Sequence, residues 1–102
     1  MSIVNRTLTP TPDAVYTSSG QSVITLGYFC NTDTVTQYVN LWLVPNGNNA
    51  DITNIIYSNV AITQSDTMVL DKEKMILDNG DALYANSNGT GVVVTTIGYI
   101  GL

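Results

Sequence analysis

The chain has 102 residues, enough for one domain, and only 11% of them are charged, less than half the share in an ordinary globular domain. The net charge is −5, with Arg6, Lys72 and Lys74 as the three cations, so the basic surface that nucleic acids and anionic membranes require is missing. Because histidine is absent and Cys30 is the single cysteine, an intrachain disulfide and the ligand sets of zinc, haem and iron–sulfur centres are excluded.

The first thirteen residues are expected to form an extended arm. Pro10 and Pro12 have no N–H group to offer a central strand, and each favours an extended residue before it. Residues 3–8 contain apolar side chains that would be poorly placed in water. We therefore predict that residues 1–13 contact a neighbouring chain and that residues 14–102 form the domain. The alternative is that residues 3–8 fold back as an edge strand of their own sheet.

The rest of the chain is predicted to form strands, because β-branched residues are abundant and clusters of Gly, Asn and Asp interrupt the apolar runs at short intervals. The segment 52–62 has apolar residues at both odd and even positions and should be one bent strand or two short ones. The charged segment 71–74 should face solvent, with one helical turn as an alternative. The expected strands are residues 14–17, 22–30, 35–44, 52–62, 67–70, 75–77, 82–85 and 92–102.

Strict alternation assigns faces to the first long strand, residues 22–30. One face would carry Ile24, Leu26, Tyr28 and Cys30. The other face would carry Val23, Thr25 and Phe29. In this apolar setting Cys30 is expected to be a small buried side chain rather than a reactive thiol.

The predicted architecture is all-β: an antiparallel β-sandwich of seven or eight strands, either jelly-roll or immunoglobulin-like. The connections leave no room for the helical crossovers of a parallel sheet. Several strands are apolar on both faces, although a sandwich needs only its inner faces apolar. We therefore expect other chains to cover some of the outer faces.

The candidate catalytic groups each have a simpler structural interpretation. No histidine is present to activate a serine, and a Ser–Lys pair would depend on Lys72 or Lys74 in the charged segment. Asp78 and Asp81 could pair as in a glycosidase, but they flank an Asn-Gly turn and are expected to bond its backbone.

The candidate binding groups lead to the same conclusion. A loose calcium site would use the acidic turn, but the EF-hand spacing is absent; its ligands would be Asp71, Glu73, Asp78, Asn79 and Asp81. Asn5 and Asn88 begin chance glycosylation sequons, and no glycine cluster forms a phosphate loop. The aromatic residues are spread over the strands and should serve packing: Tyr16, Tyr28, Phe29, Tyr38, Trp42, Tyr57, Tyr84 and Tyr99. We predict no catalytic, cofactor-binding or metal-binding residue.

Residues 14–102 resemble a broad group of short bacteriophage virion proteins. The resemblance lies in a series of apolar strands and turn residues: GYFCN at 27–31, VNLWLVP at 39–45, IIYSNV at 55–60, DTMVLD at 66–71, LDNGD at 77–81 and GYIGL at 98–102. Proteins of this kind are head decoration (cement) proteins or parts of the neck, tail and baseplate. The resemblance brings no catalytic residue with it.

The resemblance implies a non-enzymatic structural protein of a phage particle, made in the host bacterial cytoplasm and located in the virion. The first expectation is a capsid decoration protein that braces neighbouring capsid subunits. The alternatives are a neck, tail or baseplate component and a carbohydrate-binding or receptor-binding module. The expected partners are copies of the chain itself, as a homotrimer, and other structural proteins such as the major capsid protein. Nucleic acid, membrane and cofactors are not expected.

Overall fold

The computed structural model of the protein describes residues 2–71 and 74–102, and this part of the chain is all β without a helix. It therefore contains no helix that could span a membrane. The strands are β1 (Ser2–Thr7), β2 (Asp13–Thr17), β3 (Ser22–Asn31), β4 (Gln37–Val44), β5 (Ile55–Ile62), β6 (Thr67–Leu70), β7 (Met75–Leu77), β8 (Ala82–Ser87) and β9 (Val93–Gly101). The expected alternative of a helical turn in segment 71–74 involves Lys72 and Glu73, which lie outside the described residues.

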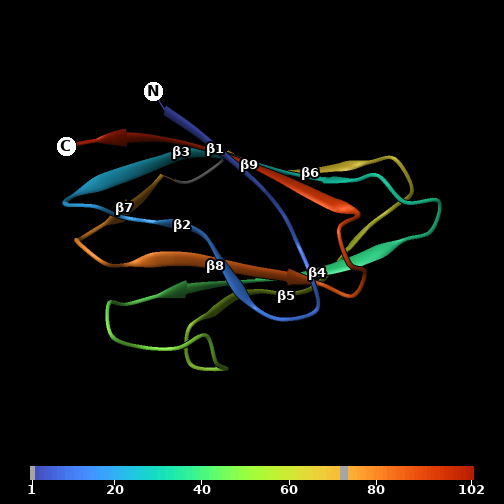
Figure 1. Cartoon of the computed structure of the whole chain (residues 1–102), viewed down its shortest axis with the longest axis horizontal. Coiled ribbons are helices and arrows are strands. Elements are labelled where there is room, and N and C mark those ends of the chain that lie inside the picture. Colours follow the sequence, from blue (N-terminus) through green and yellow to red (C-terminus); the bar gives the residue numbers. More distant parts are fainter. Residues whose placement is uncertain (1, 72–73) are drawn as a thin grey trace.

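The strands form two antiparallel sheets that pack face to face as a sandwich (Figure 1). In sheet A the order is β1-β9-β3-β6, and β7 also pairs with β3. In sheet B the order is β2-β8-β4-β5. Neighbouring strands in the sequence often lie in different sheets, so the chain passes repeatedly across the core.

The strand pairing is that of a jelly roll. β6 and β7 follow one another along the same edge of β3, so they count as one interrupted strand. The resulting eight strands pair first with last, second with seventh, third with sixth and fourth with fifth. This nesting of hairpins is the jelly-roll connectivity and differs from the immunoglobulin arrangement. The expected sandwich is confirmed, with the jelly-roll form of its two alternatives.

The core lies between the two sheets and is made by side chains from both. Phe29 and Ile97 from sheet A and Leu41 and Leu83 from sheet B are fully buried. The Tyr16 and Tyr99 rings, one from each sheet, meet with their centroids 4.4 Å apart. Each such buried side chain stabilises the fold by roughly 1.5–3 kcal/mol through removal of apolar surface from water.

The predicted alternation along β3 is wrong because the strand contains a β-bulge. Its register against β9 shifts between Ile24 and Leu26, and one extra residue turns all later side chains to the opposite face. Ile24 before the bulge and Phe29 after it therefore both enter the core, whereas Tyr28 is exposed. For the same reason Cys30 lies on the outer side of sheet A and is half-buried, not in the core as expected.

The segment expected at 52–62 forms one irregular strand. β5 begins only at Ile55, and its register against β4 shifts twice. Asn59 adopts a positive φ of 57° at the irregularity. Ile52 lies in the preceding loop and is exposed. Of the two alternatives for this segment, the single bent strand is the one observed.

The N-terminal segment belongs to the sandwich. β1 pairs antiparallel with β9 from Ser2 to Thr7. Leu8 is buried, its N–H donates to the Val93 carbonyl at 2.9 Å, and its own carbonyl accepts from Gly91 N–H at 2.8 Å. The expected arm over residues 1–13 is thus replaced by the alternative edge strand, because these hydrogen bonds and the burial of Leu8 are available within the chain. Contact of this segment with a neighbouring chain stays a prediction.

The burial of Leu8 gives a test of this arrangement. We predict that Leu8→Ala lowers the free energy of unfolding by about 2–5 kcal/mol, since it opens a cavity in the core. Ile3→Ala is the matched control, because Ile3 lies in the same segment but is 60% exposed, and it should change stability by no more than about 0.5 kcal/mol. Urea unfolding of both variants at low protein concentration is the measurement. Equal stabilities for the two variants would show that the segment does not pack as described.

Candidate functional site

The outer face of sheet A is the candidate site, and its residues follow from the strand register. Residues that pair across strands point to the same side of a sheet. Because Ile24, Phe29 and Ile97 point into the core, the alternate positions point outward. We call these outward positions the sheet A face. They are Ile3, Asn5, Thr7, Val23, Leu26, Tyr28, Cys30, Thr67, Val69, Ile76, Val94, Thr96, Gly98 and Ile100.

The sheet A face is apolar and has no charged side chain at any of these positions. Five of its large hydrophobic side chains are between 41% and 68% exposed: Ile3, Tyr28, Val69, Ile76 and Ile100. The remaining positions carry partly buried apolar residues such as Leu26, one glycine, and uncharged polar residues. Apolar patches that extend over several strands mark interaction surfaces more often than single exposed residues do.

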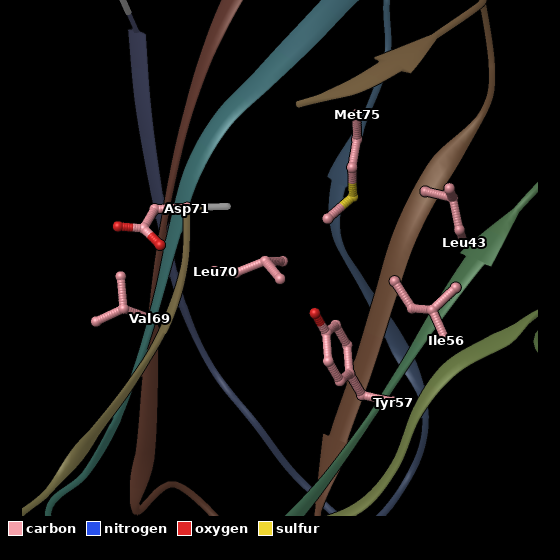
Figure 2. Close-up of a pocket in the computed structure, with 7 residues that line it drawn as sticks. All are labelled: Leu43, Ile56, Tyr57, Val69, Leu70, Asp71 and Met75. Carbon is pink, nitrogen blue, oxygen red and sulfur yellow. The ribbon is translucent and has the colours of Figure 1, made fainter. Parts of the chain in front are cut away.

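Two charged side chains of the described residues lie at the rim of the sheet A face, where β6 ends and before β7 begins. Asp71 is exposed, and Figure 2 shows its carboxylate turned to the same side as Val69. Lys74 is exposed as well, and its Nζ donates to the Thr25 carbonyl at 3.4 Å. Among the residues that the structure describes, the rim therefore carries one charge of each sign near the interruption of the edge strand.

The outer face of sheet B differs because amide side chains span it. Asn86 Nδ2 donates to the Pro10 carbonyl at 2.9 Å, and Asn40 Nδ2 donates to Asn86 Oδ1 at 2.9 Å. Asn40 Oδ1 in turn accepts from Asn59 N–H at 2.7 Å. These bonds link the loop before β2 to the edge strand β5 across β8 and β4. The network serves the fold, and the sequence analysis did not identify it.

A groove opens between the edge strands of the two sheets (Figure 2). It has a volume of about 480 Å³ and lies between β5 on one side and β6 and β7 on the other. Leu70, Met75 and Tyr57 point into it, while Val69 and Asp71 turn away. The other long side of the sandwich is closed, since the Arg6 side chain pairs with Asp13 and donates to the Ala14 carbonyl. The described residues that line the groove are largely apolar and include no acid–base pair.

The acidic turn uses its carboxylates for local structure. Asp81 accepts from the backbone N–H groups of Asn46 and Asp78. Asp78 accepts from the Gln21 side chain at 3.0 Å. The expected bond to the backbone of the turn is observed for Asp81, which accepts from Asp78 N–H, whereas the Asp78 carboxylate accepts from a side chain outside the turn. In the part of the chain that the structure describes, no group of three or more residues could hold a metal ion; Glu73 of the proposed calcium set lies outside it.

Buried hydroxyl groups form a short chain near the end of β2. The Tyr16 hydroxyl donates to Ser22 Oγ at 2.7 Å, and Ser18 Oγ lies 2.6 Å from Ser22 Oγ. Ser18 Oγ donates to the Gly20 carbonyl at 2.7 Å. Because the Ser18 hydroxyl hydrogen is used in this bond, Ser22 must donate to Ser18, and the hydrogen bonds run from Tyr16 through Ser22 and Ser18 to Gly20. With no base in contact, the hydroxyls have no route to a nucleophilic alkoxide, and they join β2 to β3.

The one resolved shift among the described titratable groups is also a turn interaction. Hydrogen bonds from the Thr53 side chain and backbone lower the pKa of the Asp51 carboxyl below its usual value. Asp51 is fully exposed in the loop before β5. Its lowered pKa reflects hydrogen bonds within the loop rather than a catalytic environment.

The exposed aromatic side chains do not form a common platform. Tyr28 lies on the sheet A face, Tyr38 on the outer side of sheet B, and Tyr57 in the groove. Stacking on a sugar ring needs aromatic faces that are adjacent and accessible. The observed arrangement gives one exposed tyrosine to each of three surfaces.

No family model, curated protein or solved structure matches this chain. Jelly-roll domains serve many functions, so the topology does not assign one by itself. The functional argument therefore depends on the composition of the sheet A face.

Asn31 is a buried polar residue that the sequence analysis treated only as part of a turn. Its Nδ2 donates to the carbonyls of Val35 and Ile62, each at 2.9 Å. Its Oδ1 accepts from Asp33 N–H at 2.9 Å. Asn31 thereby fixes the β3–β4 loop against the end of β5.

We predict that Asn31→Asp lowers the free energy of unfolding by about 1–3 kcal/mol or more, because a carboxylate cannot donate to the two carbonyls and its charge would be buried. Asn48→Asp is the matched control: it makes the same change of charge at an exposed loop position and should leave stability nearly unchanged. Urea unfolding at neutral pH compares the two variants. A loss of equal size in both would contradict the role of Asn31.

Proposed function

We propose that this protein is a non-enzymatic structural subunit of a bacteriophage particle and that it acts by packing against other protein chains. The uncharged sheet A face with its five exposed large side chains is the observation that carries the proposal. The inner faces of the two sheets already provide the core that folding requires. A second apolar face on the outside of sheet A is unnecessary for folding and favours a role in assembly.

The resemblance of residues 14–102 to short virion proteins supports a place in the particle. The jelly-roll topology agrees with this, since viral capsid domains use it, as do lectins. Within the particle, the first candidate is a capsid decoration protein that braces neighbouring capsid subunits. Its partners would be the major capsid protein and further copies of the chain, for which the resemblance implies a homotrimer.

Two alternatives remain from the sequence. A neck, tail or baseplate component would use the same face with fewer copies in each particle. A carbohydrate-binding or receptor-binding module would draw support from the lectin examples of the fold, but the dispersion of Tyr28, Tyr38 and Tyr57 over three surfaces disfavours it. Binding on a glycan array would support this module.

We predict that particles of the phage whose genome encodes this chain contain hundreds of copies of it. This is the number expected of a decoration protein. Quantitative mass spectrometry gives the copy number, and cryo-electron microscopy gives the position. A few to dozens of copies would instead indicate the neck, tail or baseplate. Absence of the chain from the particles would contradict the proposed function.

A further inference from the structure

The sheet A face has an apolar half and a more polar half. At one end, Ile76, Val23 and Ile100 form a row across β7, β3 and β9. In the next row, Leu26 and Ile3 lie on either side of Gly98. The rows toward the other end contain threonine and asparagine beside the apolar side chains: Asn5, Thr7, Thr67 and Thr96. A partner that covers this face must therefore be apolar itself and bring no charge to its centre.

The distribution of charge allows a second copy of the chain to be that partner. Each copy has a net charge of −5, so most contacts between two copies would bring like charges together. The described carboxylates lie away from the sheet A face, in the loops and at strand ends: Asp13, Asp33, Asp51, Asp66, Asp78 and Asp81, with Asp71 at the rim. Among the described residues, the sheet A face is thus a surface on which two copies can meet without opposing carboxylates.

The size of the face is sufficient for a stable contact. The strands of sheet A contain 32 residues in total; at about 3.3 Å along the strand and about 4.8 Å across it for each residue, they give a footprint of roughly 500 Å². Specific interfaces bury about 800 Å² of accessible surface on each partner, and the accessible surface of protruding side chains exceeds their footprint. Two sheets can also stack face to face at about 10 Å, as they do inside a sandwich.

The symmetry follows from the use of a single face. A patch that meets its own copy forms an isologous interface about a twofold axis, whereas a cyclic trimer needs two different complementary patches. We propose that two copies of this chain stack their sheet A faces about a twofold axis and that this dimer is the unit that enters the larger assembly. The inference rests on the proposed function: it names the partner of the same face, and it replaces the homotrimer implied by the resemblance with a twofold dimer.

Sedimentation equilibrium tests the dimer directly. We predict that the wild-type chain sediments at micromolar concentration with twice its monomer mass of 11.0 kDa. Ile76→Lys and Tyr28→Lys each place an ammonium group in the contact, twice in every symmetric dimer, and should weaken association by about 100-fold or more. Both side chains are exposed in the single chain, so the variants should keep the wild-type circular dichroism spectrum and melting behaviour as monomers.

Ile52→Lys is the matched control for these variants. It makes the same change at a side chain that is 88% exposed in the loop before β5, away from the sheet A face. This variant should dimerise like the wild type. Weakening of the dimer by Ile52→Lys to the same extent as by Ile76→Lys would overturn the assignment of the face.

Cys30 provides an independent readout in the unmodified chain. It is the single cysteine and lies half-buried on the sheet A face, so the dimer should cover it. We predict that its rate of reaction with a maleimide falls as protein concentration rises through the dissociation constant, and that Ile76→Lys removes this dependence. A wild-type rate that does not change with concentration would contradict stacking through this face.

Failure of the inference can be separated from failure of the proposed function. A wild-type chain that stays monomeric at millimolar concentration, or that sediments as a trimer, overturns the twofold dimer. If that chain is still found in purified particles, the structural function stands and another protein covers the face. If the dimer forms but the chain is absent from particles, the inference stands and the proposed function fails.

Discussion

The bulge in β3 determines which side chains of sheet A meet the core and which meet other molecules. β3 is the strand that pairs with β9, β6 and β7, so its shift between Ile24 and Leu26 affects the whole sheet. The neighbouring edge strand is interrupted at the same level: β6 ends at Leu70, opposite Gly27, and β7 begins at Met75, opposite Ile24. Because of this break, both parts of the edge can follow β3 on either side of the bulge and keep their apolar side chains in the core.

The sequence predicted the strands well because local patterns define them, and it failed where the decisive contact is distant. Apolar runs bounded by turn residues located nearly every strand. The bulge was missed because nothing in residues 22–30 marks an extra residue within an apolar run. The pairing of β1 was judged wrongly because its partner, β9, lies some ninety positions along the chain. The choice between jelly-roll and immunoglobulin order depends on the same kind of long-range pairing.

The sequence predicted that the site would be an apolar interface, but it did not predict which face of the sandwich would form it. Strands with apolar residues on both faces already indicated an interface on an outer face of the sandwich. Only the register shows that this face belongs to sheet A, that Tyr28 contributes to it and that Cys30 lies on it. The polar character of the opposite side was hidden for a similar reason, because the amide chain through Asn40 and Asn86 joins residues far apart in sequence.

The edges of the two sheets explain why association through the sheet A face would stop at a small number of chains. An open edge can add strands without end, and proteins block this with charges, bulges and interruptions. Here β1 carries Arg6 beside Asp13, β2 has a register shift between Ala14 and Tyr16, β5 is irregular at Asn59, and the β6–β7 edge is broken. Edge-to-edge pairing is therefore disfavoured on every side. Stacking about a twofold axis would occupy the sheet A face of each copy, so the contact would close on itself and leave the remaining surfaces of the dimer to bind other components of an assembly.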